Sequence, residues 1–199
     1  MKLKIYEELK QEVLNCSKCD LGCGQLDGQD PHVFGAGDLN SKIMFIAEAP
    51  GKQETIYKEC LTESGTSGKM YKKVLDYLGY TRDQVYTTNV LVCRPEKNAD
   101  PEPYQVIKCK PYFVRQLELV KPELVITFGR YAAQNFLNDF KITKDRGKIQ
   151  YSTEYRVNVF PVYHPSFVNS YAPQAKRLEF QQDIQKLKEI IKAMNKNVA

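Results

Sequence analysis

Short apolar runs alternate with amphipathic segments along most of the chain. Runs rich in β-branched and aromatic residues predict buried strands at 43–47, 85–92, 124–128 and 155–163. Apolar residues at helical spacing predict helices at 3–15, 68–78, 102–120, 130–137 and 174–194. Because strands separated by helical crossovers pair in parallel, this order predicts an α/β fold whose mainly parallel sheet is covered by helices on both faces.

The composition fits one compact domain. The 199 residues are 42% hydrophobic, which is enough apolar surface for a core, so we expect a single domain over residues 1–199. The net charge of +5 favours a polyanionic partner such as nucleic acid. The sequence has no apolar run of eighteen residues and no apolar segment behind a basic N-terminus, which predicts no membrane span, no secretory signal and a cytoplasmic location.

The six cysteines point to a metal centre. A chain without an export signal keeps its thiols reduced, which argues against a disulfide framework. A C-x2-C pair places two thiolates on one turn, and two distant cysteines can complete a tetrahedral set, although the second pair does not have zinc-ribbon spacing. The candidate ligands are Cys16, Cys19, Cys93 and Cys109. This spacing leaves zinc and iron–sulfur both open, and we expect Cys23 and Cys60 to be ordinary thiols outside the set.

Polar side chains stand at the ends of three predicted strands. Glu48 follows the first strand in the sequence AEAPG, Asn89 lies on the second, and His164 follows the fourth in the sequence YHPS. In parallel sheets the working groups gather beyond the carboxyl ends of the strands. Each residue alone also fits an ordinary hydrogen-bonded strand end, but together they predict a site that combines a carboxylate, an amide and an imidazole.

These segments resemble the family 4 uracil-DNA glycosylases. AEAPG is similar to the family's first motif, normally Gly-Glu-Ala-Pro-Gly, and YHPS resembles its second, while FGAG and the segment carrying TTNVLVCRP match further family features. The cysteines fall in the family's order, C-x2-C, a long gap and C-x15-C. The resemblance spans about residues 16–170. It implies a three-layer α/β/α domain with a four-stranded, mainly parallel sheet, and a [4Fe–4S] cluster held by the four candidate cysteines.

The resemblance also implies a reaction, hydrolysis of the N-glycosidic bond of a flipped-out uracil or modified pyrimidine to leave an abasic site. Glu48 would position or activate the water and stabilise the cationic sugar, and His164 would donate a hydrogen bond to the base carbonyl where negative charge develops. Asn89 would read the base edge. Ala47, where the family has glycine, would narrow the floor of the site.

Extruding a base from a duplex costs a few kcal/mol, so a glycosylase needs groups that hold the bent DNA. The loop after the histidine motif offers an apolar wedge, and nearby cations can hold phosphates. The candidate DNA contacts are Pro165, Ser166, Phe167, Arg146, Lys176 and Arg177. An ordinary surface loop and a solvated helix start would account for the same residues. We expect a monomer that binds DNA containing a damaged or modified base. We expect no association with a membrane.

One segment departs from the family pattern. Matching residues 65–68 to the family's Gly-x-Ala-Gly places Thr62 and Glu63 where the family has Pro-Phe. The aromatic ring that stacks on uracil would then be absent, and Glu63 would contribute to base recognition. Three hypotheses follow: a uracil glycosylase, a glycosylase for a bulky modified pyrimidine in foreign (phage) DNA, and a non-catalytic iron–sulfur DNA-binding module. The combination of Glu48, Asn89 and His164 argues against the third.

Overall fold

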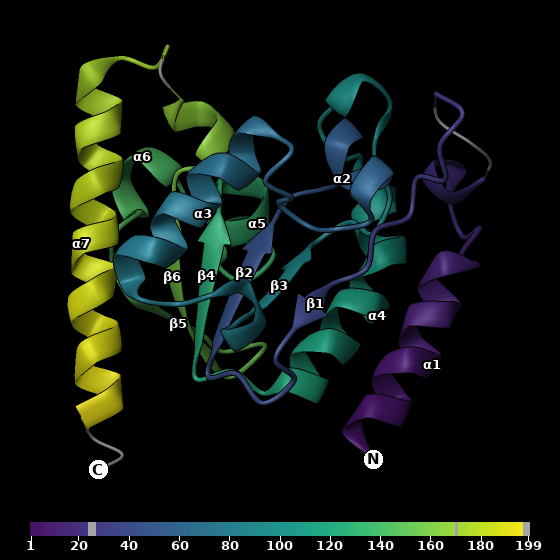
Figure 1. The fold of residues 1–199 in the computed structure, drawn as a ribbon, viewed down its shortest axis with the longest axis horizontal. Helices are drawn as coiled ribbons and strands as arrows, with labels where there is room; N and C mark the ends of the chain where they lie inside the picture. The colour runs from purple at the N-terminus through teal and green to yellow at the C-terminus, as the bar shows by residue number, and fades with distance from the viewer. Residues whose placement is uncertain (24–26, 170, 197–199) are drawn as a thin grey trace.

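A twisted sheet runs through the middle of the molecule (Figure 1). The computed structural model describes residues 1–23, 27–169 and 171–196. The strands are β1 (Ala36–Gly37), β2 (Ile43–Ala47), β3 (Tyr86–Asn89), β4 (Leu124–Phe128), β5 (Gln150–Ser152) and β6 (Val157–Val162). They lie in the order β1-β3-β2-β4-β6-β5. The four inner strands are parallel, and β1 and β5 pair antiparallel at the two edges.

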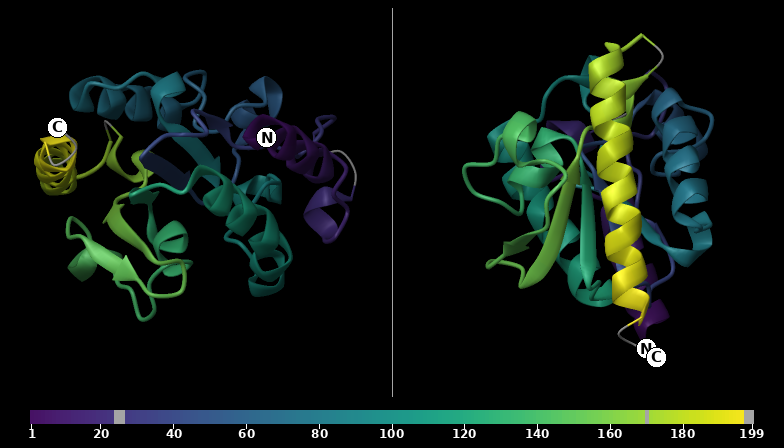
Figure 2. Two further views of the ribbon diagram at one scale, coloured as in Figure 1. Left: turned by 90° about the horizontal axis from the view of Figure 1, so that it is seen from below. Right: turned by 90° about the vertical axis from the view of Figure 1, so that its left-hand side faces the viewer.

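Helices cover both faces of the sheet (Figure 2). They are α1 (Lys2–Leu14), α2 (Lys52–Tyr57), α3 (Thr66–Leu78), α4 (Pro103–Val120), α5 (Arg130–Gln134), α6 (Ile142–Asp145) and α7 (Gln174–Lys196), with short 3₁₀ turns η1 (Asp20–Gly22), η2 (Arg82–Gln84), η3 (Glu96–Asn98) and η4 (Pro165–Val168). In the part of the chain that the structure describes, no helix is long and apolar enough to cross a bilayer.

The alternation of side chains along β2 explains the three layers. Ile43, Phe45 and Ala47 point into a core shared with α3 and α7, whereas Met44 and Ile46 point into a core shared with α4 and α5. Because both faces of β2 are buried, its sequence is a continuous apolar run rather than an alternating one. A third cluster lies between α1 and α4 and contains three of the candidate ligand cysteines. The predicted α/β class, with helices on both faces, is confirmed.

The expected count of four strands is wrong, because the sheet has six strands within the described ranges. The two additional strands are Ala36–Gly37 and Gln150–Ser152, only two and three residues long. Strands this short carry no readable alternation, so the hydrophobic pattern finds only the four inner strands. The inner strands are also shorter than predicted at two places, since the sheet contains 86–89 of the predicted 85–92 and 157–162 of the predicted 155–163.

Candidate active site

The parallel strands all end on the same side of the sheet, which we call its carboxyl edge and which is distinct from the outer strands β1 and β5. Glu48, Asn89 and His164 lie at this carboxyl edge. Ala47, the last residue of β2, is buried and is paired in register with Asn89, the last residue of β3. Glu48 follows β2 directly, and its carbonyl oxygen accepts a hydrogen bond from the N–H of Leu91 at 2.9 Å. His164 follows β6, which is separated from β2 only by β4. The three side chains therefore lie at the same edge, as the sequence predicts.

Glycine at the end of β4 allows His164 to approach closely. Gly129 has a φ of +89°, in the left-handed region that favours glycine, and its N–H donates to the carbonyl of Val162 at 2.9 Å. A Cβ added at this position would lie 3.1 Å from the Cβ of His164. Any other residue would be strained and would press on the imidazole, so the glycine helps to set its position.

Glu48 lies in a charged environment that tunes its protonation. Burial, with a smaller contribution from the Asp100 carboxylate, raises the pKa of Glu48 to about 7, and the Arg130 guanidinium opposes this shift. Asp100 is held by Arg130 at 3.6 Å and accepts a hydrogen bond from the Tyr131 hydroxyl. A carboxyl group with a pKa near the working pH combines a useful ionised fraction with good basicity, which suits a general base.

The hydrogen bonds of His164 define which ring nitrogen carries the proton. Its Nδ1 accepts the backbone N–H of Ser166 at 3.2 Å and lies 2.7 Å from the Ser166 Oγ. A backbone N–H can only donate, so Nδ1 is an acceptor and the proton of the neutral ring is on Nε2. Burial lowers the pKa of His164 to about 4, which keeps the ring neutral at physiological pH. The imidazole is thus a neutral hydrogen-bond donor through Nε2.

Asn89 has a buried amide that is only partly satisfied. The residue is 1% exposed, and its Nδ2 donates to Glu54 Oε1 at 3.3 Å and to Cys60 Sγ at 3.5 Å. Its Oδ1 has no hydrogen-bond partner among the residues that the structure describes. A buried acceptor left without a partner costs about 1–3 kcal/mol. A ligand that donates a hydrogen bond to Oδ1 would recover this free energy.

The candidate ligand cysteines come together from distant segments. Cys16, Cys93 and Cys109 are buried, and Cys19 is half-buried. Cys16, Cys93 and Cys109 belong to one buried apolar cluster. Burial raises the pKa of the Cys93 thiol, and the other three cysteines raise it further. No three His, Cys, Asp or Glu side chains of the described ranges are close enough to hold a single metal ion. Thiolates that each bind a different iron of a cluster need not converge so closely.

A buried histidine connects two of these cysteine segments. The His32 ring nitrogen Nε2 lies 2.8 Å from the Cys16 carbonyl oxygen, and His32 also forms an isolated antiparallel β-bridge with Cys93. On its other side, Nδ1 lies 2.6 Å from Asp30 Oδ1, and Asp30 is paired with Lys58 at 2.8 Å. The cysteine segments are therefore tied to each other through the segment before β1, independently of any metal.

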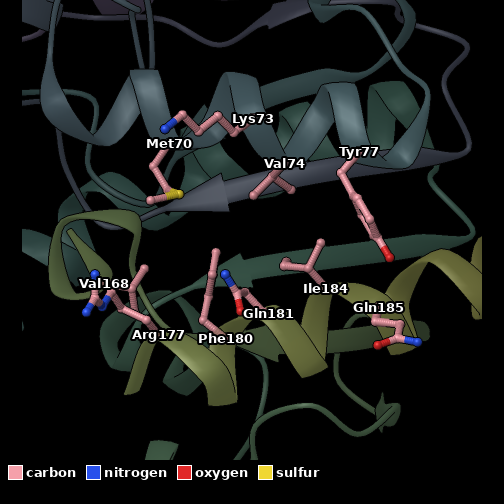
Figure 3. Close-up of a pocket in the computed structure, with 10 residues that line it drawn as sticks. All are labelled: Met70, Lys73, Val74, Tyr77, Val168, Arg177, Phe180, Gln181, Ile184 and Gln185. Atoms are coloured by element: carbon pink, nitrogen blue, oxygen red, sulfur yellow. The ribbon is translucent and has the colours of Figure 1, made fainter. Parts of the chain in front are cut away.

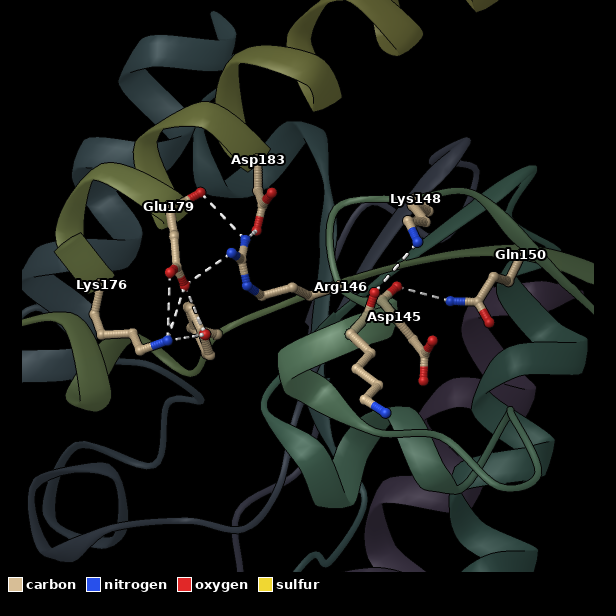
Figure 4. Close-up of polar contacts among 9 residues, drawn as sticks. Asp145, Arg146, Lys148, Gln150, Lys176, Glu179 and Asp183 are labelled. Carbon is tan, nitrogen blue, oxygen red and sulfur yellow. Dashed lines mark hydrogen bonds and ion pairs between the residues drawn. The ribbon is translucent and has the colours of Figure 1, made fainter.

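Two of the cations predicted to hold phosphates instead pair with carboxylates of α7 (Figure 4). Arg146 is 2.8 Å from Glu179, pairs with Asp183, and stacks over the Tyr163 ring at 4.6 Å. Lys176 donates to the Tyr163 hydroxyl at 3.0 Å and lies 3.1 Å from Glu179. Carboxylates therefore offset both charges, and a DNA-binding role for these two side chains stays a prediction.

The other candidate DNA contacts are mostly at the surface. Phe167 on η4 is 53% exposed and packs its ring 5.1 Å from that of Tyr163. Ser166 is exposed as well, whereas Pro165 is buried beneath them. Arg177 is exposed on α7 and lines a cavity of about 450 Å³ between α3 and α7 (Figure 3). Contact of these residues with DNA stays a prediction.

The Uracil DNA glycosylase superfamily matches residues 34–188, a range that includes every strand of the sheet. The chain belongs to this superfamily. It is 37% identical to a type-4 uracil-DNA glycosylase of Archaeoglobus fulgidus, an alignment that covers 94% of each chain. It is 36% identical to that of Sulfurisphaera tokodaii, over 92% of this chain and 84% of the relative, and 30% identical to that of Thermotoga maritima, over 95% and 96%. The resemblance read from the motifs is confirmed.

Within this glycosylase fold, the loop between α2 and α3 differs from the arrangement that the motif alignment predicts. Glu63, expected beside the base, is exposed, whereas Cys60 is 2% exposed and lies against Asn89. Leu61 has a φ of +51°, and this left-handed turn follows Cys60 and buries Leu61. The wall beside the amide is therefore formed by residues earlier in the loop than Thr62, and a role of Glu63 in base recognition stays a prediction.

Sequence reasoning misses four residues around the glycosylase site: Glu54, Cys60, Asp100 and Arg130. Arg130 directly follows the glycine at the end of β4, so the strand-end rule that finds Glu48 could have found it. Glu54 is the third residue of α2, where its side chain caps the helix. Because this capping role already explains a glutamate at the position, the sequence gives no sign of its second contact, with the Asn89 amide. Asp100 stands in a polar segment without any periodic signal.

Proposed function

We propose that this protein removes uracil from DNA by hydrolysing the N-glycosidic bond and leaving an abasic site. The observation that carries this proposal is the convergence of Glu48, Asn89 and His164 at one edge of a sheet that belongs to the uracil DNA glycosylase superfamily. Relatives that cover nearly the whole chain are named uracil-DNA glycosylases, so the alternatives of a bulky modified base and of a non-catalytic module are not favoured.

Glu48 would act on the sugar and the water. Cleavage of the bond between base and deoxyribose develops positive charge on the sugar ring, which an ionised carboxylate stabilises. The same carboxylate can take a proton from the attacking water, and such general-base help contributes about 10²–10⁴-fold. Because the pKa of Glu48 is about 7, a large fraction of the protein is in the required ionised form at neutral pH.

His164 would act on the departing base. Negative charge accumulates on the carbonyl oxygen next to the broken bond, and a preorganised donor at that oxygen contributes about 10²–10³-fold. The neutral ring with its proton on Nε2 can donate without first taking up a proton, and the Nδ1 contact with Ser166 fixes its orientation. Asn89 would accept a hydrogen bond from the base edge through Oδ1. All of these groups come from one chain, which is consistent with action as a monomer.

Cys16, Cys19, Cys93 and Cys109 would hold a [4Fe–4S] cluster. Four cysteine thiolates are the usual ligand set of an iron–sulfur cluster, and three of the four thiols are buried in an apolar cluster. The ligands follow α1, follow β3 and lie on α4, so the group would cross-link these elements, and we assign it this structural role.

Loss of one thiolate tests the cofactor. We expect Cys109→Ser to bind little iron and to unfold at a markedly lower temperature, because metal binding supplies folding free energy. The measurements are iron and zinc content after anaerobic purification, and thermal unfolding. Cys23→Ser, at an exposed thiol outside the set, is the control. Stoichiometric zinc without iron in the unmutated protein would contradict the assignment.

The proposed reaction is tested by single-turnover excision from matched oligonucleotides that contain one uracil, thymine or cytosine. We expect abasic-site formation from uracil and much slower release of the other two bases. Single- and double-stranded forms of each oligonucleotide should be compared. Absence of release from every uracil substrate by iron-replete protein would refute the proposed function.

A further inference from the structure

The polarity of the groups around Asn89 is fixed by the backbone. Glu54 Oε1 accepts the N–H of Leu61 at 2.7 Å, and Oε2 accepts the N–H of Gly51 at 2.8 Å. A backbone N–H cannot reverse its role, and the ionised carboxylate has no proton to donate, so both of its oxygens are acceptors. Burial raises the pKa of Glu54, and the hydrogen bonds that the carboxylate accepts from Leu61, Gly51 and Asn89 oppose this shift and favour the ionised form. The Asn89 atom that faces Oε1, at 3.3 Å, must therefore be the donor nitrogen Nδ2 and not the amide oxygen.

Cys60 imposes the same polarity from a second direction. Its sulfur lies 3.7 Å from the carbonyl oxygen of Phe34, which can only accept, so the S–H donates there. Burial raises the pKa of Cys60 well above its usual value, which keeps the proton on the sulfur. The sulfur lone pairs are then left to accept from Asn89 Nδ2 at 3.5 Å. Rotating the amide by 180° would break both contacts and place its oxygen against two acceptors.

The loop that carries Cys60 is itself held in place. Arg82 on η2 donates to the Leu61 carbonyl at 3.0 Å and to the Cys60 carbonyl, and it lies 3.0 Å from the Glu59 carboxylate. Its guanidinium also stacks over the Tyr71 ring at 5.3 Å. These contacts anchor the Cys60 and Leu61 carbonyls and the Glu59 side chain, so Arg82 helps to hold the backbone that carries the thiol in place.

We propose that Glu54 and Cys60 are positioning residues that lock the Asn89 amide with its oxygen available to the base, and that this lock makes the site select uracil over cytosine. The inference rests on the proposed function. Uracil presents a ring N3–H that Oδ1 can accept, whereas cytosine presents a lone pair at N3. A free asparagine amide can flip to match either edge, but the locked one matches only the N–H. Sites built to pair a substrate hydrogen bond reject unmatched analogues by about 10⁴-fold or more.

Glu54→Met tests the lock. Methionine nearly keeps the length of the side chain but removes both carboxylate oxygens, so no acceptor faces Asn89 from this side and the amide can flip. We expect the ratio of uracil to cytosine excision to fall by at least about tenfold, the worth of one hydrogen bond in such a site. The ratio of uracil to thymine excision should stay within about threefold, because thymine presents the same N3–H edge. A merely loosened pocket would change both ratios together.

A matched pair at Cys60 tests the lock without altering the cap of α2. Cys60→Ser keeps a group that can donate to Phe34 and accept from Asn89, whereas Cys60→Ala removes it. We expect the serine variant to retain the uracil-to-cytosine ratio and the alanine variant to lower it, with thermal unfolding measured for each. Equal ratios in the alanine variant and the unmutated protein, together with an unchanged ratio in Glu54→Met, would overturn the proposal.

A measurement without catalysis separates this inference from the proposed function. The side-chain NH₂ of Asn89 should give two well-separated, slowly exchanging proton signals in ¹⁵N-labelled unmutated protein, and faster exchange in Glu54→Met, which has no carboxylate oxygen to hold it. If the unmutated protein excises uracil but its Asn89 NH₂ exchanges rapidly, the lock is refuted and the function stands. If the NH₂ is protected but no uracil is released, the function is refuted, and selection of uracil by the lock is refuted with it.

Discussion

Polar groups at the carboxyl edge of the sheet and polar groups between β6 and α7 have different environments. At the sheet edge, Asn89 Oδ1 is buried without a partner among the described residues, and the pKa of Glu48 is shifted to about 7. Between β6 and α7, Arg146 is held by the carboxylates of Glu179 and Asp183, although its Nε has no partner among the described residues and burial raises the pKa of Asp183. The two regions therefore differ in ion pairing: in the part of the chain that the structure describes Glu48 forms no ion pair, as suits a group that acts on a ligand, whereas the charges beside α7 neutralise one another and serve the fold. Mutations should therefore change chemistry in the first region and stability in the second.

The largest expected effect is on stability. Arg146→Ala should lower the free energy of unfolding by about 3–5 kcal/mol, because it leaves a buried carboxylate unpaired. That carboxylate belongs to Asp183, whose side chain is 3% exposed. The measurement is urea unfolding. Arg115→Ala is the matched control, since Arg115 is paired at 2.8 Å with Glu12 at the surface and such pairs contribute about 1 kcal/mol or less. Equal losses in both variants would contradict the contrast between the regions.

The next effect is on chemistry. Glu48→Ala and His164→Ala should each lower single-turnover uracil excision by at least about a hundredfold, the usual scale for losing a general base or an oxyanion donor. Affinity for uracil-containing DNA should change little. Glu189→Ala supplies a control at an exposed glutamate of α7. Near-normal excision by both Glu48→Ala and His164→Ala would place the chemistry on other residues.

Protonation of Glu48 should shape the pH profile. The base must be ionised, so the single-turnover rate should fall about tenfold per pH unit below a midpoint near the Glu48 pKa of about 7. His164 has a pKa of about 4 and stays neutral over this range, so a second limb should not appear between pH 5 and 9. Rates on one uracil oligonucleotide at constant ionic strength provide the measurement. A profile that is flat from pH 5 to 8 would show that Glu48 does not act as the base.

The smallest effect should be on DNA binding. Arg177 is exposed on α7, near the loop after His164, and Arg177→Ala should weaken DNA binding about threefold and reduce the salt slope by about 1. Lys4→Ala removes an exposed cation from α1, which lies at the opposite end of the sheet (Figure 1), and should leave binding unchanged. The DNA affinity of Arg146→Ala, measured under conditions where this variant is folded, extends the comparison. If Arg146→Ala loses more affinity than Arg177→Ala, the Arg146 side chain contacts DNA as well.

Features that repeat along the chain could be predicted from the sequence. The inner strands follow from apolar runs, and the convergence of Glu48, Asn89 and His164 follows from parallel pairing, which places all carboxyl ends at one edge. Pairing between distant side chains leaves no such pattern. Arg146 and Asp183 are 37 residues apart, and their pairing depends on how α7 packs against β6.

The loop between α2 and α3 shows a second limit. Counting residues back from the glycine motif places Glu63 beside the base, but the left-handed turn at Leu61 decides which side chain faces Asn89. A positive φ at a leucine has no sequence signature, because it is imposed by the contacts of the surrounding loop. The contacts made by Arg82 on this loop come from a separate turn, 21 residues further along the chain from Leu61.

The short edge strands also affect how the protein behaves at high concentration. A long, exposed edge offers a row of unpaired N–H and C=O groups on which another chain can add a strand, and this is a common route to aggregation. Here β1 contributes two residues and β5 three, so each border of the sheet offers little backbone for such addition. Gly37 in β1 also lies so close to its neighbour that a Cβ there would be 1.9 Å from the Val85 carbonyl oxygen. Lengthening β1 or β5 by engineering would therefore enlarge the sheet but lower the solubility of the protein.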